Sequence, residues 1–436
     1  MRLDWQCAPV DAVRGTVRVP GDKSISHRAI MLGALAEGTT EVSGFLEGED
    51  CLATMRAFQA MGVEIVHHGA GRVTVHGAGL HGLRAPAAPL DVGNSGTSMR
   101  LLAGVLAGQP FDAVLVGDAS LMKRPMRRVT EPLTLMGAEI ATSDVGTAPL
   151  VIHGRPLHGM DYTLPVASAQ LKSALLLAGL FADGTTRVTE PGVSRDHSER
   201  MLRGFGVSVE KDGATLTIRG GQRLSACEVV VPGDVSSAAF FLVAGLIARE
   251  GELLLENVGM NPTRAAVVEI LRAMGGDIVV LNAREAGGEP VADLRVRPSR
   301  LHGITIDKAL VPIAIDEFPI LFIAAACAEG ETRATALHEL RVKESDRLAT
   351  MEAGLRALGV DCVAGADSMA IRGKPGTAFS GGTVESHGDH RIAMSFAVAA
   401  LRAAAPIVVR DCANVATSFP SFQTLAQGVG MVVCDA

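Results

Sequence analysis

Clusters of basic residues, most of them leading into an apolar run, are the parts of this chain whose residue types and spacing could do chemistry. They read PGDKSISHR from Pro20, MKRPM from Met122, SAQLK from Ser168, RVKESDRL from Arg341 and GDHRIAMSF from Gly388. Most of the runs are typical of buried helices, whose free N–H groups and dipole also attract anions. Together the clusters predict a pocket for a small anionic ligand, whereas a solvated basic helix end explains any one of them alone.

Carboxylates accompany two of these clusters. Asp316 and Glu317 directly precede the apolar run FPILFIAAA, and Glu344 lies between Lys343 and Arg347. We expect Lys343 and Arg347, which are four residues apart, to lie on one face of a helix. A carboxylate beside a cation at a helix start is how general acids and bases are held and tuned. A salt-bridged surface helix is the alternative interpretation of this segment.

The segment GNSGTSMR from Gly93 adds an uncharged polar turn before another apolar helix. Gly96 has no side chain, which leaves room for a ligand to approach the backbone. An ordinary helix N-cap explains Ser95 and Thr97 without any ligand. The chain has no G-x-x-x-x-G-K-[ST] motif and no C-x-x-C pair, and His197 is not at metal-ligand spacing from another His or Cys. We therefore expect neither ATP-type phosphate binding nor a bound metal.

A pattern that recurs six times must position these residues. Its first half is a turn, a short strand and a loop into a helix, as in GTTEVSGFLEGEDCLATMRAF from Gly38. Its second half is a helix end, a glycine expected in the left-handed conformation, and two strands. Five such glycines follow at intervals of 75, 69, 69 and 84 residues, and a sixth copy from Pro406 is degenerate: Gly62, Gly137, Gly206, Gly275 and Gly359. This period predicts an α/β fold built from one repeated strand–helix unit.

Composition narrows the class of protein. A length of 436 residues predicts two or three domains, and 48% hydrophobic residues with 20% charged residues exclude a disordered chain. The net charge of -7 argues against nucleic-acid or anionic-membrane partners. The longest apolar run, from Ala238 to Ala248, is shorter than the roughly 20 residues of a membrane span. Seven scattered cysteines without a C-x-x-C pair favour reduced thiols in a cytoplasmic protein.

The basic and polar motifs, taken in order along the chain, resemble those of 5-enolpyruvylshikimate-3-phosphate synthase. They are PGDKSISHR, GNSGTSMR, MKRPM, SAQLKSALL, DEFPI, RVKESDR and GDHRIAMSF, and GDKS, SAQLK, RDHSE and NPTR are similar to the class II bacterial branch. The resemblance implies the two-domain enolpyruvyl transferase fold, with six βαβαββ repeats, three per domain, and a cleft between the domains. It implies a domain I of residues 1–20 and 234–436 and a domain II of residues 21–233.

The resemblance also implies an activity and its residues. Enolpyruvyl transfer from phosphoenolpyruvate to the 5-hydroxyl of shikimate 3-phosphate would release phosphate through a tetrahedral intermediate, with no metal or organic cofactor. The implied catalytic residues are Asp316, Glu344 and Lys23. The implied shikimate 3-phosphate residues are Lys23, Ser24, Arg28, Ser168, Ala169, Gln170, Arg195, Asp316 and Lys343. The implied phosphoenolpyruvate residues are Lys23, Gly96, Arg124, Gln170, Arg347 and Arg391.

Two positions depart from the class I pattern. His27 stands where class I members have Asn, and Thr417 stands where they have a late Lys near the phosphate. The second departure puts a C-terminal phosphate contact in question. We expect a monomer whose only partners are its small-molecule substrates.

Two alternatives remain open on sequence grounds. The enolpyruvyl transferase that acts on UDP-N-acetylglucosamine shares the fold and the donor, but its pattern has Lys-Asn in place of Lys23-Ser24 and a reactive Cys in a mobile loop. The corresponding loop from Asp118 to Met126 has no Cys here. A non-catalytic anion-binding repeat protein is the second alternative. Such a protein would need no acidic residues among its basic ones, so Asp316 and Glu344 argue against it.

Overall fold

The computed structural model describes residues 3–436, which divide into two compact units. Unit 1 contains residues 3–20, Pro232–Glu285 and Glu289–Ala436, and unit 2 contains Gly21–Val231 and Ala286–Gly288. Each unit has its own apolar core. Within the described residues, no helix is both long enough and apolar enough to cross a membrane.

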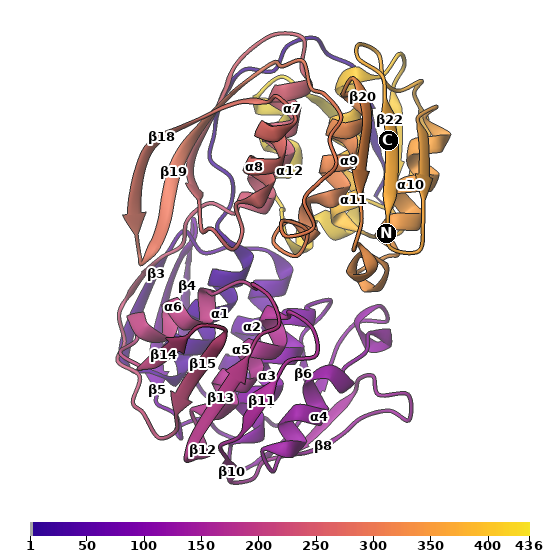
Figure 1. Cartoon of the computed structure of the whole chain (residues 1–436). Helices are drawn as coiled ribbons and strands as arrows, with labels where there is room; N and C mark the ends of the chain where they lie inside the picture. Colours follow the sequence, from indigo (N-terminus) through magenta and orange to yellow (C-terminus); the bar gives the residue numbers. More distant parts are fainter. Residues whose placement is uncertain (1–2) are drawn as a thin grey trace. The chain divides into compact units, whose positions relative to one another are not determined.

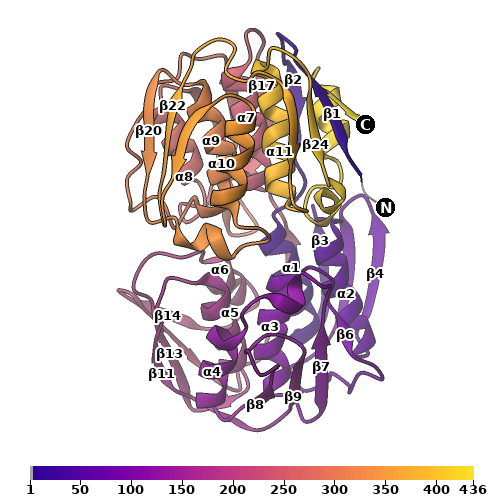
Figure 2. The ribbon, with the colours of Figure 1, turned by 90° about the vertical axis from the view of Figure 1, so that its right-hand side faces the viewer.

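Three helices that are buried on almost every side form the centre of each unit (Figure 1, Figure 2). All thirteen residues of α7 and all ten residues of α9 are buried, which fits a helix that is apolar all round. The central helices of unit 2 are α1 (Lys23–Leu35), α3 (Gly96–Ala107) and α5 (Ala169–Gly179). Those of unit 1 are α7 (Val235–Ile247), α9 (Phe318–Cys327) and α11 (His390–Ala399).

A second, outer helix follows each central helix along the chain. The outer helices of unit 2 are α2 (Glu49–Ala60), α4 (Arg127–Leu135) and α6 (His197–Gly204). Those of unit 1 are α8 (Ala266–Ala273), α10 (Arg347–Ala357) and α12 (Phe422–Gly428). One central and one outer helix per copy reproduce the sixfold pattern of the sequence.

Each copy also contributes one small sheet, against which its central helix packs. In unit 2 the first sheet has the strand order β16 (Glu228–Val230), β3 (Glu37–Ser43), β5 (Arg72–Ala78), β4 (Glu64–Gly69). The second has the order β6 (Leu90–Asp91), β7 (Asp112–Val116), β9 (Leu150–His153), β8 (Glu139–Ala141). The third has the order β11 (Asp161–Thr163), β13 (Thr185–Thr189), β15 (Thr215–Arg219), β14 (Val209–Asp212). A short parallel pair joins β10 (Leu157–His158) to β12 (Ala182–Asp183).

The sheets of unit 1 follow the same plan. The first has the strand order β18 (Asp277–Ala286), β19 (Glu289–Arg297), β17 (Leu253–Gly259), β2 (Gly15–Val17). The second has the order β20 (Gly330–Ala334), β22 (Met369–Gly373), β21 (Asp361–Ala364). The third has the order β23 (Gly382–Glu385), β24 (Ile407–Arg410), β1 (Trp5–Ala8), β25 (Val432–Asp435). The N-terminal strands β1 and β2 therefore complete two sheets of unit 1, which explains why the first residues of the chain belong to this unit.

The repeated glycines end the outer helices as the sequence predicts. All five adopt φ between 83° and 96°, the left-handed region that a residue with a Cβ atom rarely enters. In the degenerate sixth copy, Gly430 has φ 96° just after α12. The backbone at these positions confirms that the pattern marks helix C-termini.

One expectation about a helix is wrong. Lys343 and Arg347 do not share a helical face, because α10 begins only at Arg347. Asp346 caps this helix by accepting a hydrogen bond from the backbone N of Ala349 (3.0 Å), so the residues before it remain outside. Lys343 instead follows the short 3₁₀ helix η3 (His338–Val342) in extended backbone.

Candidate active site

The start of α1 carries the first group of predicted site residues in unit 2. Asp22 caps the helix through the backbone N of Ile25 (2.9 Å), so the helix begins at Lys23. Lys23 forms an ion pair with Asp50, which lies in the first turn of α2. A cation and the N-terminus of α1 therefore stand together, an arrangement that attracts anions.

Arg28 ties three helices of unit 2 together. Its Nη1 donates to the backbone O of Ser24 (2.8 Å), its Nη2 to Ser173 Oγ on α5 (2.7 Å), and its Nε to Ser198 Oγ on α6 (2.7 Å). Arg28 is buried, and its hydrogen bonds to α5 and α6 connect residues 145 and 170 positions away along the chain. It therefore holds the start of α1 against two other helices, α5, which Ser168 caps, and α6, which follows Arg195.

Gly96 and Gln170 are brought together by an arginine that the sequence analysis did not select. Gln170 Oε1 accepts a hydrogen bond from Arg100 Nη1 (2.7 Å), and Gln170 Nε2 donates to Thr97 Oγ1 (3.0 Å). Arg100 Nη1 also lies 3.5 Å from the backbone O of Gly96. Ser168, as the N-cap of α5, accepts from the backbone N of Leu171 (3.3 Å), which starts the helix at Ala169 and turns Gln170 toward α3.

Arg124 lies beside the same turn. Its Nη2 donates to Asn94 Oδ1 (2.6 Å), and Asn94 Nδ2 donates to Asp118 Oδ2 (2.7 Å). A Cβ atom placed on Gly96 would lie only 3.3 Å from Arg124 Nη1. The structure thus gathers Gly96, Gln170 and Arg124, which the sequence analysis selected as phosphoenolpyruvate residues.

A buried chain of hydroxyl groups links α1, α2 and α3 close to this turn. Thr54 Oγ1 lies 2.8 Å from His27 Nδ1 and 2.6 Å from Ser98 Oγ, and Ser98 Oγ donates to Ser95 Oγ (2.7 Å). Burial, with the charges of Lys23 and Arg28, holds the pKa of His27 well below its ordinary value. His27 is therefore neutral at pH 7, and we assign it to packing and hydrogen bonding in this chain.

In unit 1 the predicted residues surround a fully buried arginine. Arg347 Nε donates to Asp389 Oδ2 (2.8 Å), its Nη2 to Glu344 Oε2 (2.6 Å), and its Nη1 to Asp316 Oδ1 (3.3 Å). Burial alone would lower the pKa of Arg347, but these three carboxylates raise it above its ordinary value. Burial would likewise raise the pKa of Asp389, but the charge of Arg347 holds it below its ordinary value. Both groups are charged at pH 7.

Asp316 joins Lys343 to this network. Its Oδ1 lies 3.1 Å from Lys343 Nζ, so Lys343 and Arg347 meet on one carboxylate even though they do not share a helix. A buried cation requires compensating charge. The carboxylates around Arg347 supply that charge, in addition to any role as a general base. They leave the cluster far less positive than its lysine and arginines alone would make it.

Arg391 lies in the first turn of α11, which Asp389 caps by accepting from the backbone N of Arg391 (3.0 Å). Arg391 Nη1 donates to the backbone O of Asp316 (3.0 Å) and lies 3.4 Å from Glu317 Oε1. The predicted residues of unit 1, Asp316, Lys343, Glu344, Arg347 and Arg391, therefore form one connected cluster.

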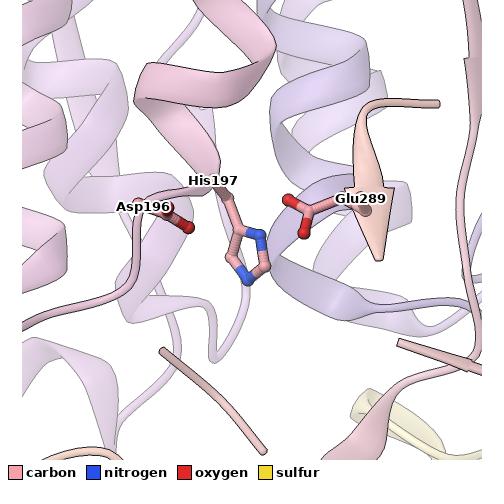
Figure 3. A group of neighbouring side chains, drawn as sticks. All are labelled: Asp196, His197 and Glu289. Carbon is pink, nitrogen blue, oxygen red and sulfur yellow. The ribbon is translucent and has the colours of Figure 1, made fainter. Parts of the chain in front are cut away.

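Two predicted positions remain, one in each unit. Arg195 is in the loop before α6, and Thr417 ends the 3₁₀ helix η5 (Ala413–Thr417). Thr417 Oγ1 donates to the backbone O of Asn414 (2.7 Å), so its hydroxyl group is used locally. Figure 3 draws Asp196 and His197, which open α6 in unit 2, and Glu289, which begins β19 in unit 1.

Several functional candidates escaped the sequence analysis. Arg100 stood inside the motif GNSGTSMR, but its role depends on Gln170, 70 residues further along the chain. Asp50 and Asp389 gave only the signal of acids at helix starts, which ordinary capping explains. Nothing local to the sequence pairs them with Lys23 and Arg347.

A solved enolpyruvyl transferase, NikO from Streptomyces tendae, covers 100% of this chain and 99% of its own with a TM-score of 0.80 and 18% identity, which shows the fold alone. The chain therefore has the two-domain fold of that enolpyruvyl transferase.

Closer relatives identify the family. The family model described as EPSP synthase (3-phosphoshikimate 1-carboxyvinyltransferase) matches residues 7–425. The 3-phosphoshikimate 1-carboxyvinyltransferase of Alkalilimnicola ehrlichii is 63% identical over 99% of this chain and 96% of its own length. The solved EPSP synthase of Acinetobacter baumannii has 53% identity and a TM-score of 0.90, and each chain is covered completely. The chain belongs to the EPSP synthase family.

The predictions of family, of fold class and of an enzyme are therefore confirmed. The alternative activity on UDP-N-acetylglucosamine is not favoured, since the curated relatives at this level of identity are 3-phosphoshikimate 1-carboxyvinyltransferases.

Proposed function

We propose that this chain transfers the enolpyruvyl group of phosphoenolpyruvate to the 5-hydroxyl of shikimate 3-phosphate and releases phosphate. Membership of the EPSP synthase family over nearly the whole chain carries this proposal. The 5-hydroxyl oxygen adds to the central carbon of phosphoenolpyruvate while the methylene carbon takes a proton. The tetrahedral adduct then loses phosphate and that proton, which restores the double bond.

The shikimate 3-phosphate residues come mainly from unit 2. We assign its phosphate to the start of α1 and α5, where helix N–H groups and the side chains of Lys23, Ser24, Ser168 and Gln170 supply donors, with Ala169 beside them and Arg195 nearby along the chain. Arg28 is held by Ser24, Ser173 and Ser198, so its contribution combines charge with positioning. Asp316 and Lys343 are the residues of unit 1 that we assign to this substrate.

The phosphoenolpyruvate residues come from both units. In unit 2 they are Lys23, Gly96, Arg124 and Gln170. Hydrogen bonds to Asn94 and from Arg100 hold Arg124 and Gln170, respectively. In unit 1 they are Arg347 and Arg391. Four of these six residues carry a full positive charge matched to the carboxylate and phosphate of the donor.

Proton transfer is assigned to Asp316, Glu344 and Lys23. Asp316 accepts the proton of the 5-hydroxyl, and Glu344 with Lys23 exchanges the proton at the methylene carbon. The ion pairs of Asp316 and Glu344 with Arg347 support these roles, because they hold both carboxylates in one orientation.

A phosphate-release assay tests the proposal. Purified chain and phosphoenolpyruvate are supplied with shikimate 3-phosphate, with shikimate, or with UDP-N-acetylglucosamine. We expect phosphate release only with shikimate 3-phosphate. Release with UDP-N-acetylglucosamine alone would replace this proposal with the sister activity. The monomeric state stays a prediction, which the molar mass measured by light scattering of the purified protein checks.

A further inference from the structure

A buried carboxylate that has no assigned role lies directly behind Arg391. Glu317 ends the 3₁₀ helix η2 (Ile315–Glu317) and precedes the central helix α9. Only 1% of its surface is exposed. Its Oε1 accepts a hydrogen bond from Ser236 Oγ and lies 3.4 Å from Arg391 Nη1. An ionised carboxylate buried this deeply needs a cation, and Arg391 is the cation that pairs with it.

Hydrogen bonds behind Glu317 fix its position. Arg264, which is also buried, donates from Nη2 to Ser236 Oγ (2.7 Å) and to Asp234 Oδ1 (3.0 Å). A serine hydroxyl has one proton. Because Ser236 accepts from Arg264, it can give that proton to Glu317. The network therefore runs in one direction, from the start of α7 to the start of α11.

The two arginines assigned to phosphoenolpyruvate in unit 1 differ in what they can still bind. Arg347 has Nε, Nη1 and Nη2 all engaged by carboxylates and a side chain that is 1% exposed. Among residues 3–436, the guanidinium group of Arg391 contacts protein acceptors through Nη1 alone, and the side chain is 15% exposed. Its Nε and Nη2 form the edge of the guanidinium group that binds a carboxylate with two parallel hydrogen bonds.

We propose that Glu317 is a positioning residue that orients Arg391 for the carboxylate of phosphoenolpyruvate. Glu317 and the Asp316 carbonyl hold Nη1 from one side, which directs the Nε and Nη2 edge away from the protein. Ser236 and Arg264 keep Glu317 in place, and Glu317 itself does not touch the substrate. This inference rests on the proposed binding of phosphoenolpyruvate by Arg391.

Steady-state kinetics of Glu317→Gln test the inference. Glutamine keeps the shape and the acceptor for Ser236 but removes the charge that holds Arg391. We expect the KM for phosphoenolpyruvate to rise about tenfold, equivalent to 1.4 kcal/mol, while the KM for shikimate 3-phosphate stays within about twofold. Asp293→Asn is the matched control, because Asp293 on strand β19 is a carboxylate that lies 3.4 Å from an arginine, Arg284 on β18. It should leave both constants unchanged.

A double-mutant cycle separates this inference from the proposed function. Arg391→Lys keeps the charge but loses the two-bond edge, so Glu317→Gln should have little further effect in that background. If Arg391→Lys leaves the KM for phosphoenolpyruvate unchanged, the proposed role of Arg391 fails. If Arg391→Lys raises this KM but Glu317→Gln does not, the positioning role of Glu317 is overturned. Equal increases in both KM values for Glu317→Gln would also overturn it, because they indicate general distortion.

Ser236→Ala provides a second route in case Glu317→Gln does not fold. It removes one hydrogen bond to Glu317 and leaves the ion pair with Arg391 intact. We expect a smaller increase, about two- to threefold, in the KM for phosphoenolpyruvate alone. An unchanged KM for phosphoenolpyruvate in folded Ser236→Ala counts against the network.

Discussion

Replacing Gly96 with alanine tests the geometry of the α3 turn most directly. Gly96 is the first residue of α3, and a Cβ atom there would lie 2.8 Å from Arg100 Nη1 and 3.3 Å from Arg124 Nη1. The first distance is shorter than two such atoms tolerate, so Arg100 must move by a few tenths of an ångström. Both contacts are with the ends of flexible side chains, and the helix itself can remain in place.

The displacement affects the residues that we assign to phosphoenolpyruvate. Arg100 Nη1 donates to Gln170 Oε1 at 2.7 Å, and a hydrogen bond from a charged group contributes about 1.5–3 kcal/mol. Weakening it without breaking it should cost roughly 1 kcal/mol, which raises the KM for phosphoenolpyruvate about fivefold. Glyphosate, the family's inhibitor that competes with phosphoenolpyruvate, is longer. Overpacking against it should cost about 1–3 kcal/mol, or about ten- to a hundredfold in affinity.

The assay compares the glyphosate inhibition constant with the KM for phosphoenolpyruvate at saturating shikimate 3-phosphate. We expect Gly96→Ala to raise the first more than the second. Gly428→Ala is the control, because an added Cβ on this helical glycine in α12 would meet no atom within 4 Å beyond its chain neighbours and the backbone of its own helix. If Gly96→Ala changes both constants by one factor, Gly96 does not border the space that distinguishes the two molecules.

Three further predictions concern catalysis and stability. Asp316→Asn and Glu344→Gln should each lower kcat by about 10²–10⁴-fold, and a variant that changes only KM has been assigned the wrong role. Thr54→Val removes the hydroxyl at the centre of the buried chain and should lower the free energy of unfolding by about 1–3 kcal/mol; exposed Thr134→Val should not, and equal denaturation midpoints would refute the network. Asp389 has a lowered pKa, so its ion pair stabilises the fold above pH ~3.9 and is lost as the pH falls through the folded-state value. Asp389→Asn should lower the melting temperature at pH 7 and flatten its decline in acid, and an unaltered acid profile would contradict this assignment.

Local patterns in the sequence predicted the repeated unit and the starts of the helices that bear the site. Asp22, Ser95, Ser168 and Asp389 each cap a helix through a backbone N two or three residues ahead. Such signals need only neighbouring residues, so they can be recognised without a fold. The same is true of the glycines that end the outer helices, where φ is positive.

The limits of the sequence are clearest at Lys343 and Arg347. Helical spacing predicted a shared face, but the Asp346 cap starts α10 after Lys343. The two cations meet only because Asp316, which lies in η2 before the central helix α9, contacts both. Spacing along the chain cannot reveal a shared partner of this kind.

The sequence by itself determined the repeat, the helix starts and the residue types from which a site for anions could be built. Only the tertiary structure decided which of those residues pair. Arg28 meets Ser173 and Ser198, Arg100 meets Gln170, and Glu317 meets Arg391 across separations of 70 to 170 residues. The physical reason is range: caps and turns depend on neighbours in the chain, whereas a buried charge is compensated by whichever group the packing of the central helices brings within hydrogen-bonding distance.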